Sequence, residues 1–107
     1  MNVPELSHLQ FLVLADLMRE EKTGREIRET LRRYRVRQSG PAFYQMMARL
    51  EKAGLATGWY TQQVVGGQII KERQYRITAG GARAWEECRS FYMRAGGAAD
   101  DTGLAHA

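Results

Sequence analysis

The chain has 107 residues, of which 44% are hydrophobic and 26% are charged, and its formal net charge is +4. This length allows one domain, because two domains of half the size would each bury too little core. No apolar run reaches the length of a membrane span, and the first residues lack the basic start of a secretory signal, so we expect a cytoplasmic protein.

The sequence offers no site for covalent, metal or cofactor chemistry. Cys88 is the single cysteine, which excludes an internal disulfide and is compatible with a reducing cytoplasm. Cys88, His8 and His106 lack the spacing of a zinc site. No nucleophile–base constellation or phosphate-cradling glycine loop is visible. We therefore expect that the chain is not an enzyme and binds no cofactor or metal.

Two helices are predicted in the first third of the chain. The first, over residues 4–21, has apolar side chains at helical spacing in a stripe wide enough for a central core helix: Leu6, Leu9, Val13 and Leu17. Thr23 is the expected N-cap of the second helix, over residues 24–34. Its pattern predicts that Ile27, Leu31 and Tyr34 are buried, and most of the arginines then lie on its exposed faces.

The third helix is expected over residues 40–53, with Ser39 as its N-cap and Pro41 in its first turn. A buried face is predicted at i, i+3, i+4 and i+7, at Phe43, Met46, Met47 and Leu50. The other face carries Tyr44, Gln45, Ala48 and Arg49, side chains that can contact phosphates and base edges. Gly54 then ends the helix, since glycine takes the left-handed conformation without a Cβ clash.

The hydrophobic period changes after Gly54. Residues 56–65 and 68–78 are rich in β-prone side chains and flank Gly66-Gly67, which predicts an antiparallel hairpin. In its second strand we expect Tyr75 and Ile77 to pack on the helices.

A fourth helix is predicted over residues 79–94, with Thr78 as its N-cap. One stripe of this helix is aromatic-rich and contains Trp85, Cys88, Phe91 and Tyr92. Residues 96–107 have too little hydrophobic content to fold alone, and we expect them to be disordered.

Positive charge is concentrated on the second and third helices. Residues 22–52 contain nine basic and three acidic side chains, a local net charge of +6, so the rest of the chain is slightly acidic. Such asymmetry argues for an anionic partner more strongly than the total charge does. A solvated, salt-bridged helix face is the alternative, and charge alone would favour it.

The order of elements is that of a winged helix-turn-helix domain, in which residues 36–39 supply the short turn between the second and third helices. In that arrangement the third helix enters the major groove, and the hairpin, or wing, touches the flanking backbone. We therefore predict a mainly helical α+β fold with a winged-helix DNA-binding domain over residues 1–78, a C-terminal dimerisation helix over residues 79–95 and a disordered tail over residues 96–107.

The chain also resembles the PadR-type transcriptional regulators, over roughly Leu9 to Tyr92. Three blocks carry the resemblance: TGREI at 23–27, SGPAFY with RLEKAGL at 39–44 and 49–55, and KERQYRITAGG at 71–81. Members of this family are dimeric bacterial repressors with a C-terminal helical dimerisation element. The resemblance implies DNA binding through Tyr44 and its neighbours and pairing through the fourth helix. Some members bind flat aromatic compounds at the dimer interface, which makes a small aromatic effector a further candidate partner.

The chain departs from the family at Arg25, where members often have an aromatic residue. The candidate DNA-binding residues lie on the second helix, the third helix and the wing: Arg25, Arg28, Ser39, Pro41, Tyr44, Gln45, Arg49, Gln68, Lys71 and Arg73. Some have structural alternatives: Tyr44 could pack on the hairpin, and Arg49 could pair with Glu26 or Glu51.

The fourth-helix residues Trp85, Cys88, Phe91 and Tyr92 could be ordinary core, dimer interface or the wall of an effector pocket, of which we favour the interface. The predicted function is a dimeric, sequence-specific regulator of transcription, in the first place a repressor, that binds double-stranded DNA. The alternative is a winged-helix module that binds protein through its hairpin and aromatic helix, with the arginines merely keeping it soluble.

Overall fold

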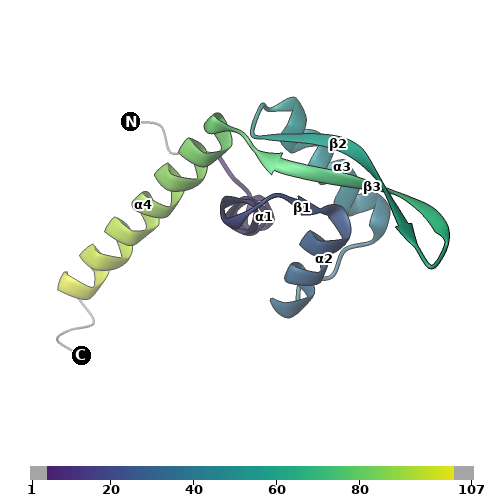
Figure 1. The fold of residues 1–107 in the computed structure, drawn as a ribbon. Helices are drawn as coiled ribbons and strands as arrows, with labels where there is room; N and C mark the ends of the chain where they lie inside the picture. Colours follow the sequence, from purple (N-terminus) through teal and green to yellow (C-terminus); the bar gives the residue numbers. More distant parts are fainter. Residues whose placement is uncertain (1–4, 103–107) are drawn as a thin grey trace.

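The structure is a computed structural model that describes residues 5–102, and Figure 1 shows its helices around a small antiparallel sheet. The elements in chain order are α1 (His8–Arg19), β1 (Lys22–Thr23), α2 (Gly24–Arg33), α3 (Gly40–Lys52), β2 (Ala56–Val65), β3 (Gln68–Ile77) and α4 (Ala79–Thr102). The strands are arranged in the order β1-β3-β2. The predicted mainly helical α+β class is confirmed.

Side-chain caps set where the first two helices begin. α1 starts at His8 and not at residue 4, because Ser7 and Gln10 bond each other's backbone N–H in a capping box. Thr23 and Glu26 form the same box at α2, which confirms Thr23 as the N-cap. The hydrogen bond from the Thr23 backbone, more than any other contact, holds the pKa of Glu26 below its ordinary value.

The end of α2 differs from the prediction. Tyr34 is 62% exposed, so its predicted burial is wrong. Arg35 takes the left-handed conformation with φ +60° and donates its N–H to Arg32, while the Val36 N–H donates to Leu31 over 2.9 Å. This Schellman-type ending turns the chain so that Val36, and not Tyr34, packs against the core.

The third helix and its stop follow the sequence pattern. Phe43, Met46, Met47 and Leu50 are buried, and Ser39 is the N-cap, as predicted. Gly54 has φ +76°, the left-handed conformation expected of it, and the next N–H closes the turn by donating to the carbonyl of Leu50.

The sheet is built around the hairpin of β2 and β3, whose register runs from Ala56 opposite Ile77 to Val65 opposite Gln68. Both turn glycines have positive φ, as a two-residue type I′ turn requires. Tyr75 is buried and Ile77 packs against the core, which confirms their predicted direction. Burial raises the pKa of the Tyr75 phenol to about 12. The sequence did not predict β1, whose two residues pair with β3, because so short a strand leaves no periodic signal.

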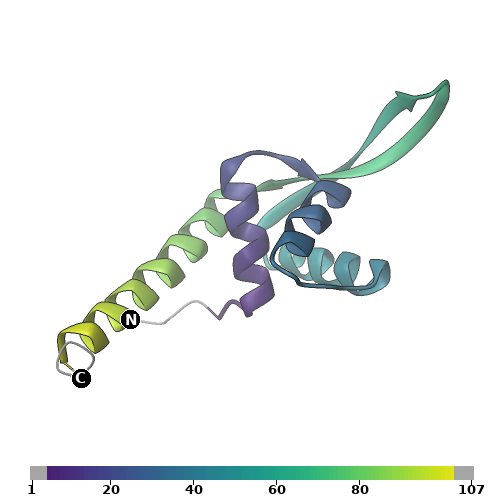
Figure 2. The ribbon, with the colours of Figure 1, turned by 90° about the horizontal axis from the view of Figure 1, so that it is seen from below.

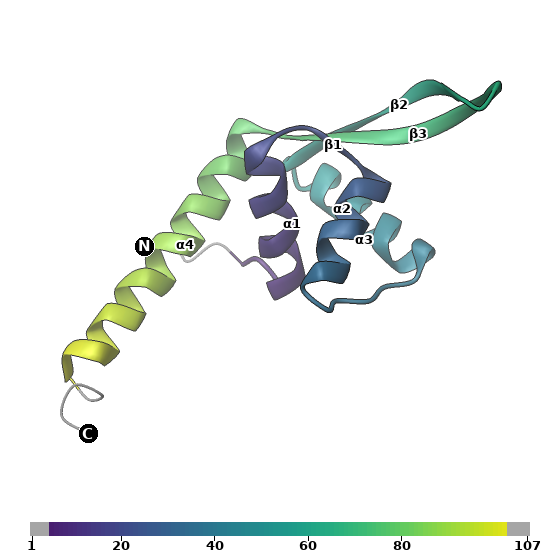
Figure 3. The ribbon, with the colours of Figure 1, turned by 60° about the horizontal axis from the view of Figure 1, so that its bottom comes forward.

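α4 begins against the body and then leaves it, as Figures 2 and 3 show. Its first turn approaches so closely that a Cβ on Gly81 would lie 2.0 Å from the Leu55 carbonyl oxygen. The helix continues to Thr102, whereas the sequence predicted its end at residue 94. Extending a formed helix through an alanine-rich segment is easier than nucleating one, which offsets the cost of Gly96 and Gly97. The last part of the predicted tail, residues 103–107, lies outside the described residues.

Candidate nucleic-acid interface

One face of α3 is exposed along its whole length. Tyr44, Gln45, Ala48 and Arg49 point away from the core, as the helical period predicted. Among the described residues no carboxylate lies within 4 Å of Arg49, and the predicted alternatives are engaged elsewhere: Glu26 caps α2 and Glu51 pairs with Arg73. Arg49 therefore presents an uncompensated charge on this face.

The start of α3 is exposed, but its N-cap side chain is already hydrogen-bonded within the helix. The Ser39 hydroxyl accepts a hydrogen bond from the Ala42 N–H over 3.2 Å, so its side chain serves the helix first. Pro41 lies exposed in the first turn. A helix N-terminus of this kind attracts anions through its free N–H groups and its dipole.

Tyr44 packs on the start of α2. A Cβ built on Gly24 would lie 2.8 Å from the Tyr44 Oη and 2.9 Å from its Cε1. The ring also meets Phe43 edge to face, with centroids 5.0 Å apart. Tyr44 remains 41% exposed, so its ring is held on two sides while part of it stays accessible.

The exposed face of α3 and one face of the hairpin line a single hollow of about 520 Å³, which we call the α3–hairpin concavity. Its lining comes from α2, α3 and both long strands: Gly24, Arg25, Tyr44, Ala48, Glu51, Tyr60, Lys71, Glu72, Arg73 and Tyr75. Tyr60 lies opposite Arg73 in the register, and Lys71 is two residues along, so these three share one hairpin face, which we call the inner face.

The root of the hairpin is tied to α3 by an ion pair. Arg73 Nη2 donates to Glu51 Oε1 over 2.8 Å, and both side chains are about three-quarters buried. The guanidinium also lies 4.8 Å from the centre of the Tyr60 ring, and the Lys71 ammonium lies 4.5 Å from the same ring. Arg73 thus fixes the hairpin relative to α3, while Lys71 remains on the exposed part of the inner face.

Arg25 is also paired. Its guanidinium lies 3.0 Å from Glu72 Oε1, which joins the first turn of α2 to β3. The second oxygen of Glu72 is buried and has no hydrogen-bond partner within the described part of the chain. The charge on Arg25 is therefore partly compensated before any partner arrives.

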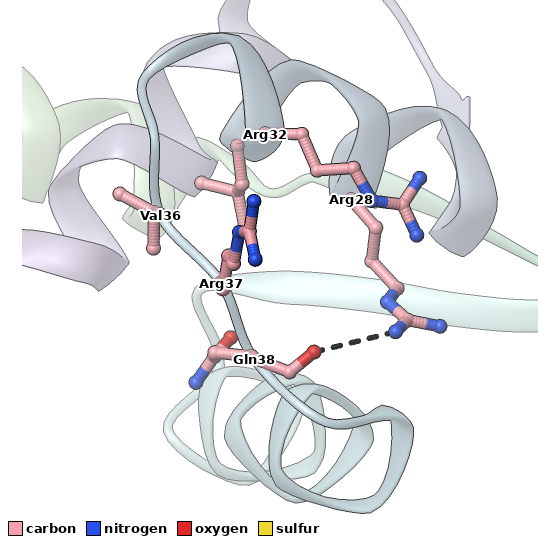
Figure 4. Close-up of a pocket in the computed structure, with 6 residues that line it drawn as sticks. Arg28, Arg32, Val36, Arg37 and Gln38 are labelled. Carbon is pink, nitrogen blue, oxygen red and sulfur yellow. Dashed lines mark hydrogen bonds between the residues drawn. The ribbon is translucent and has the colours of Figure 1, made fainter.

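A second hollow, of about 380 Å³, lies at the turn between α2 and α3 (Figure 4). We call it the arginine cavity; its lining is Arg28, Leu31, Arg32, Val36, Arg37 and Gln38. Arg28 donates to the Gln38 carbonyl over 3.3 Å and lies 5.9 Å from the Phe43 ring centre. Arg32 pairs with Glu29, whereas Arg28 and Arg37 have no carboxylate within 4 Å among residues 5–97.

Solved structures of similar shape identify this arrangement. A PadR family regulator from Clostridium difficile superposes with a TM-score of 0.74 at 17% identity, covering 89% of this chain and 97% of that one. A transcriptional regulator from Clostridium thermocellum gives 0.69 at 18%, covering 92% and 99%. A PadR family regulator from Eggerthella lenta gives 0.65 at 25%, covering 90% and 82%. The chain has the fold of the PadR-type transcriptional regulators.

No protein-family model matches the sequence, and no curated protein matches it either. The similarity to PadR-type regulators is thus carried by the fold over about nine-tenths of the chain. The matched proteins are described as transcription regulators and not as enzymes. In this PadR-type fold α3 is the third helix of the winged domain, and the hairpin of β2 and β3 is the wing.

The predicted fourth-helix residues do not share one surface in the PadR-type fold. Trp85 stacks on Phe11 of α1, with centroids 5.6 Å apart, and Cys88 is buried. Phe91 and Tyr92 are exposed beyond the body. A mainly apolar groove of about 440 Å³ joins the two groups along α1 and α4, and it is lined by Leu6, Ser7, His8, Phe11, Cys88, Arg89, Tyr92 and Met93.

Sequence reasoning missed two residues of the arginine cavity, Arg32 and Arg37. Both belong to the basic segment, but the left-handed turn at Arg35 decides which arginines face the start of α3, and an arginine at that position gives no signal for such a turn.

No helix within residues 5–102 is long and apolar enough to cross a bilayer. The same part of the chain contains no cluster of three or more His, Cys, Asp or Glu side chains that could bind a metal ion.

Proposed function

We propose that the chain is a dimeric, sequence-specific DNA-binding regulator of transcription, that it acts as a repressor, and that it works in the cytoplasm. One observation carries the proposal: the exposed face of α3 and the inner face of the hairpin line one concavity, with arginines along its edges. A duplex seated on this surface meets a helix in its major groove and cations at its flanking phosphates.

Base readout falls to the middle of α3. Gln45 and Arg49 are four residues apart and exposed, so their side chains lie next to each other over the groove. Glutamine pairs with adenine and arginine with guanine in the major groove. Tyr44, held against Gly24, places its hydroxyl at the groove edge, where it donates to a phosphate oxygen.

Backbone contacts fall to the edges of the surface. Arg28 and Arg37, in the arginine cavity beside the N-terminus of α3, are the cations best placed for one phosphate, and Ser39 and Pro41 at the start of α3 contact the same phosphate. Lys71 and the tip residue Gln68 meet the backbone on the wing side, and Arg25 contributes where its pairing with Glu72 allows. Arg73 acts as a positioning residue, because its charge is already engaged by Glu51.

The experiment is fluorescence anisotropy with DNA from the region upstream of the gene, across a salt series. We expect affinity to fall steeply with salt, and Arg49→Ala or Tyr44→Ala to weaken binding by 1–3 kcal/mol each, which is about 5- to 150-fold. The control is Arg83→Ala on α4, which removes an exposed charge that lines neither the α3–hairpin concavity nor the arginine cavity. Binding that is independent of salt, or unaffected by both α3 variants, would refute the proposal and favour a protein-binding module.

Pairing is assigned to α4. Its outer part projects from the body (Figure 2). Phe91, Tyr92 and Met93 are exposed on this helix, and the last two line the apolar groove along α1. Exposed aromatic residues of this density are typical of an interface core. A two-fold dimer places the two α3 helices on half-sites about 34–36 Å apart. Light scattering should give twice the mass of the chain, and the double variant Phe91→Ser with Tyr92→Ser should give the monomer.

We propose that a small aromatic effector binds in the apolar groove. Its walls are Phe11, Tyr92 and Met93, and Trp85 stacks directly behind Phe11. Titration with a planar aromatic dye such as proflavine, without DNA, should quench the tryptophan fluorescence in a saturable way. A linear, non-saturable response would remove the effector from the proposal without affecting DNA binding.

A further inference from the structure

The tip of the hairpin is unusually apolar for an exposed loop. Val64 and Val65 of β2 are 74% and 54% exposed, and Ile69 and Ile70 of β3 are 71% and 38% exposed. These four aliphatic side chains surround Gly66-Gly67, and no charged residue occurs between Thr61 and Ile70. Burying apolar side chains of this size is favourable, so four neighbouring ones left exposed at one hairpin tip need an explanation.

The register divides the four between two faces. Val64 lies opposite Ile69, and residues directly opposite each other in an antiparallel pair share a face. Every second residue along each strand points to the same face, so Lys71 and then the pair of Tyr60 and Arg73 follow on this face toward the body. Val64 and Ile69 are therefore the outermost pair of the inner face. Val65 and Ile70 belong to the opposite face.

The inner face is continuous with the surface of α3. Tyr60, Lys71 and Arg73 line the same concavity as Tyr44 and Ala48, so a rigid body that rests on α3 continues along the inner face toward the tip. From Gly58, where β2 leaves the core, to Val64 the strand extends about 20 Å at ~3.3 Å per residue. Half a turn of DNA measures about 17 Å, which is the distance from a major groove to the next minor groove.

We propose that Val64 and Ile69 form an apolar wedge that enters the minor groove beside the major groove occupied by α3. This inference rests on the proposed DNA-binding function and adds a mode of recognition to it. The two side chains contact deoxyribose walls and partly unstack one base step, which bends the duplex away from the wing. The absence of acidic residues between Thr61 and Ile70 lets the tip approach a polyanion without repulsion, and Lys71 behind it binds the groove edge.

The wedge gives the protein selectivity at a position where no side chain reads a base edge. Pyrimidine–purine steps such as TA and CA/TG unstack more easily than other steps, so the sequence under the tip changes affinity through deformation energy. Replacing such a step by a stiff A-tract under the tip should weaken binding, while the same change outside the contacted region should not.

The two hairpin faces provide a matched pair of variants. Val64→Ser with Ile69→Ser removes the proposed wedge, and Val65→Ser with Ile70→Ser removes the same kinds of side chain from the opposite face. All four positions are outside the core, so both variants should retain the wild-type circular dichroism spectrum. Binding is measured by anisotropy on the upstream DNA, and bending by energy transfer between dyes at the two DNA ends.

We expect the inner-face variant to lose about 10-fold in affinity and most of the DNA bend, with an unchanged salt slope because no charge is removed. The opposite-face variant should bind and bend DNA within about twofold of wild type. Equal behaviour of the two variants, or an unbent wild-type complex, overturns the wedge. If wild type binds with salt dependence and Arg49→Ala weakens binding as expected above, such a result overturns the wedge alone. If wild type does not bind DNA at all, the proposed function fails with it.

Discussion

The Tyr44 ring of α3 occupies the space where any side chain at position 24 would lie. A Cβ on Gly24 would come within 2.8 Å of the Tyr44 hydroxyl oxygen and within 2.9 Å of the ring. The first turn of α2 and the second turn of α3 therefore share one contact, and the absence of a side chain on α2 sets where the phenol lies. The direction of a candidate DNA-contacting group is thus determined by a residue that need not touch DNA.

Gly24→Ala should weaken DNA binding by about 5- to 10-fold through displacement of Tyr44. Alanine is the better helix former by about 1 kcal/mol, and this gain offsets part of the cost of moving the Tyr44 side chain, so we expect a small change in the free energy of unfolding. Anisotropy and urea denaturation measure the two effects separately. Gly80→Ala, a helical position where the nearest contact of the new Cβ is an ordinary 3.4 Å, is the control and should leave affinity unchanged. Wild-type affinity in Gly24→Ala would mean that the position of Tyr44 is unimportant.

Glu51→Gln tests whether Glu51 affects DNA binding through its own charge or through the position of the wing, which it holds by its ion pair with Arg73. Removing one negative charge from the DNA-facing side should strengthen binding if only net charge mattered. Because Glu51 holds Arg73 at 2.8 Å and thereby fixes the hairpin root, we expect weaker binding, by about 3- to 10-fold. Arg73→Gln should weaken binding as well, and the double variant should lose less than the sum of the two. Tighter binding by Glu51→Gln would show that the ion pair does not position the wing.

Periodicity and turn chemistry account for what the sequence could predict. The buried face of α3 follows from apolar side chains at helical spacing, and the wing follows from two β-prone runs around Gly66-Gly67. These local rules also gave the N-caps Thr23 and Ser39. They hold because each depends on neighbours within a few residues.

The parts that sequence reasoning missed depend on distant residues or on an unfavourable backbone conformation. The pairing of Arg73 with Glu51 joins positions 22 residues apart, so the Arg73 charge is engaged within the chain in a way that no local pattern indicates. The exposure of Tyr34 and the arginine cavity both follow from the left-handed Arg35, a position where the sequence has no glycine to mark the turn. The short strand β1 exists only because β3 passes beside it.

Tyr75 should make the protein sensitive to alkali. Burial raises its pKa to about 12 in the folded chain, against about 10 in an unfolded one. Its contribution to stability is therefore complete below pH 10 and is lost as the pH rises through 12, because the unfolded chain releases the proton first. Between pH 9 and 12 we expect the unfolding free energy of wild type to fall by about 2 kcal/mol more than that of Tyr75→Phe. Tyr34→Phe, at an exposed position, is the control and should follow the wild-type profile in urea titrations.

Gly81→Ala should be severely destabilising, because its Cβ would lie 2.0 Å from the Leu55 backbone oxygen and 2.8 Å from an Ile77 side-chain carbon. The start of α4 must then move away from the sheet, at a cost of about 3 kcal/mol or more. Gly80→Ala is the matched neighbour, since its nearest contact is an ordinary 3.4 Å. It should be neutral or slightly stabilising in thermal denaturation. Similar melting temperatures for the two variants would contradict the close approach.

Arg35→Gly should stabilise the fold, which is an unusual result for a glycine substitution. Arg35 has φ +60°, a conformation that costs an L-residue about 1–2 kcal/mol, and glycine adopts it without a Cβ clash. Part of this gain is offset by the greater freedom of glycine in the unfolded chain, so we expect a net gain of about 0.5–1 kcal/mol. Arg35→Ala removes the same charge but keeps the Cβ, so the difference between the two variants isolates the backbone effect. Urea denaturation should rank Arg35→Gly above Arg35→Ala by about 1 kcal/mol, and equal stabilities would show that the left-handed turn carries no strain.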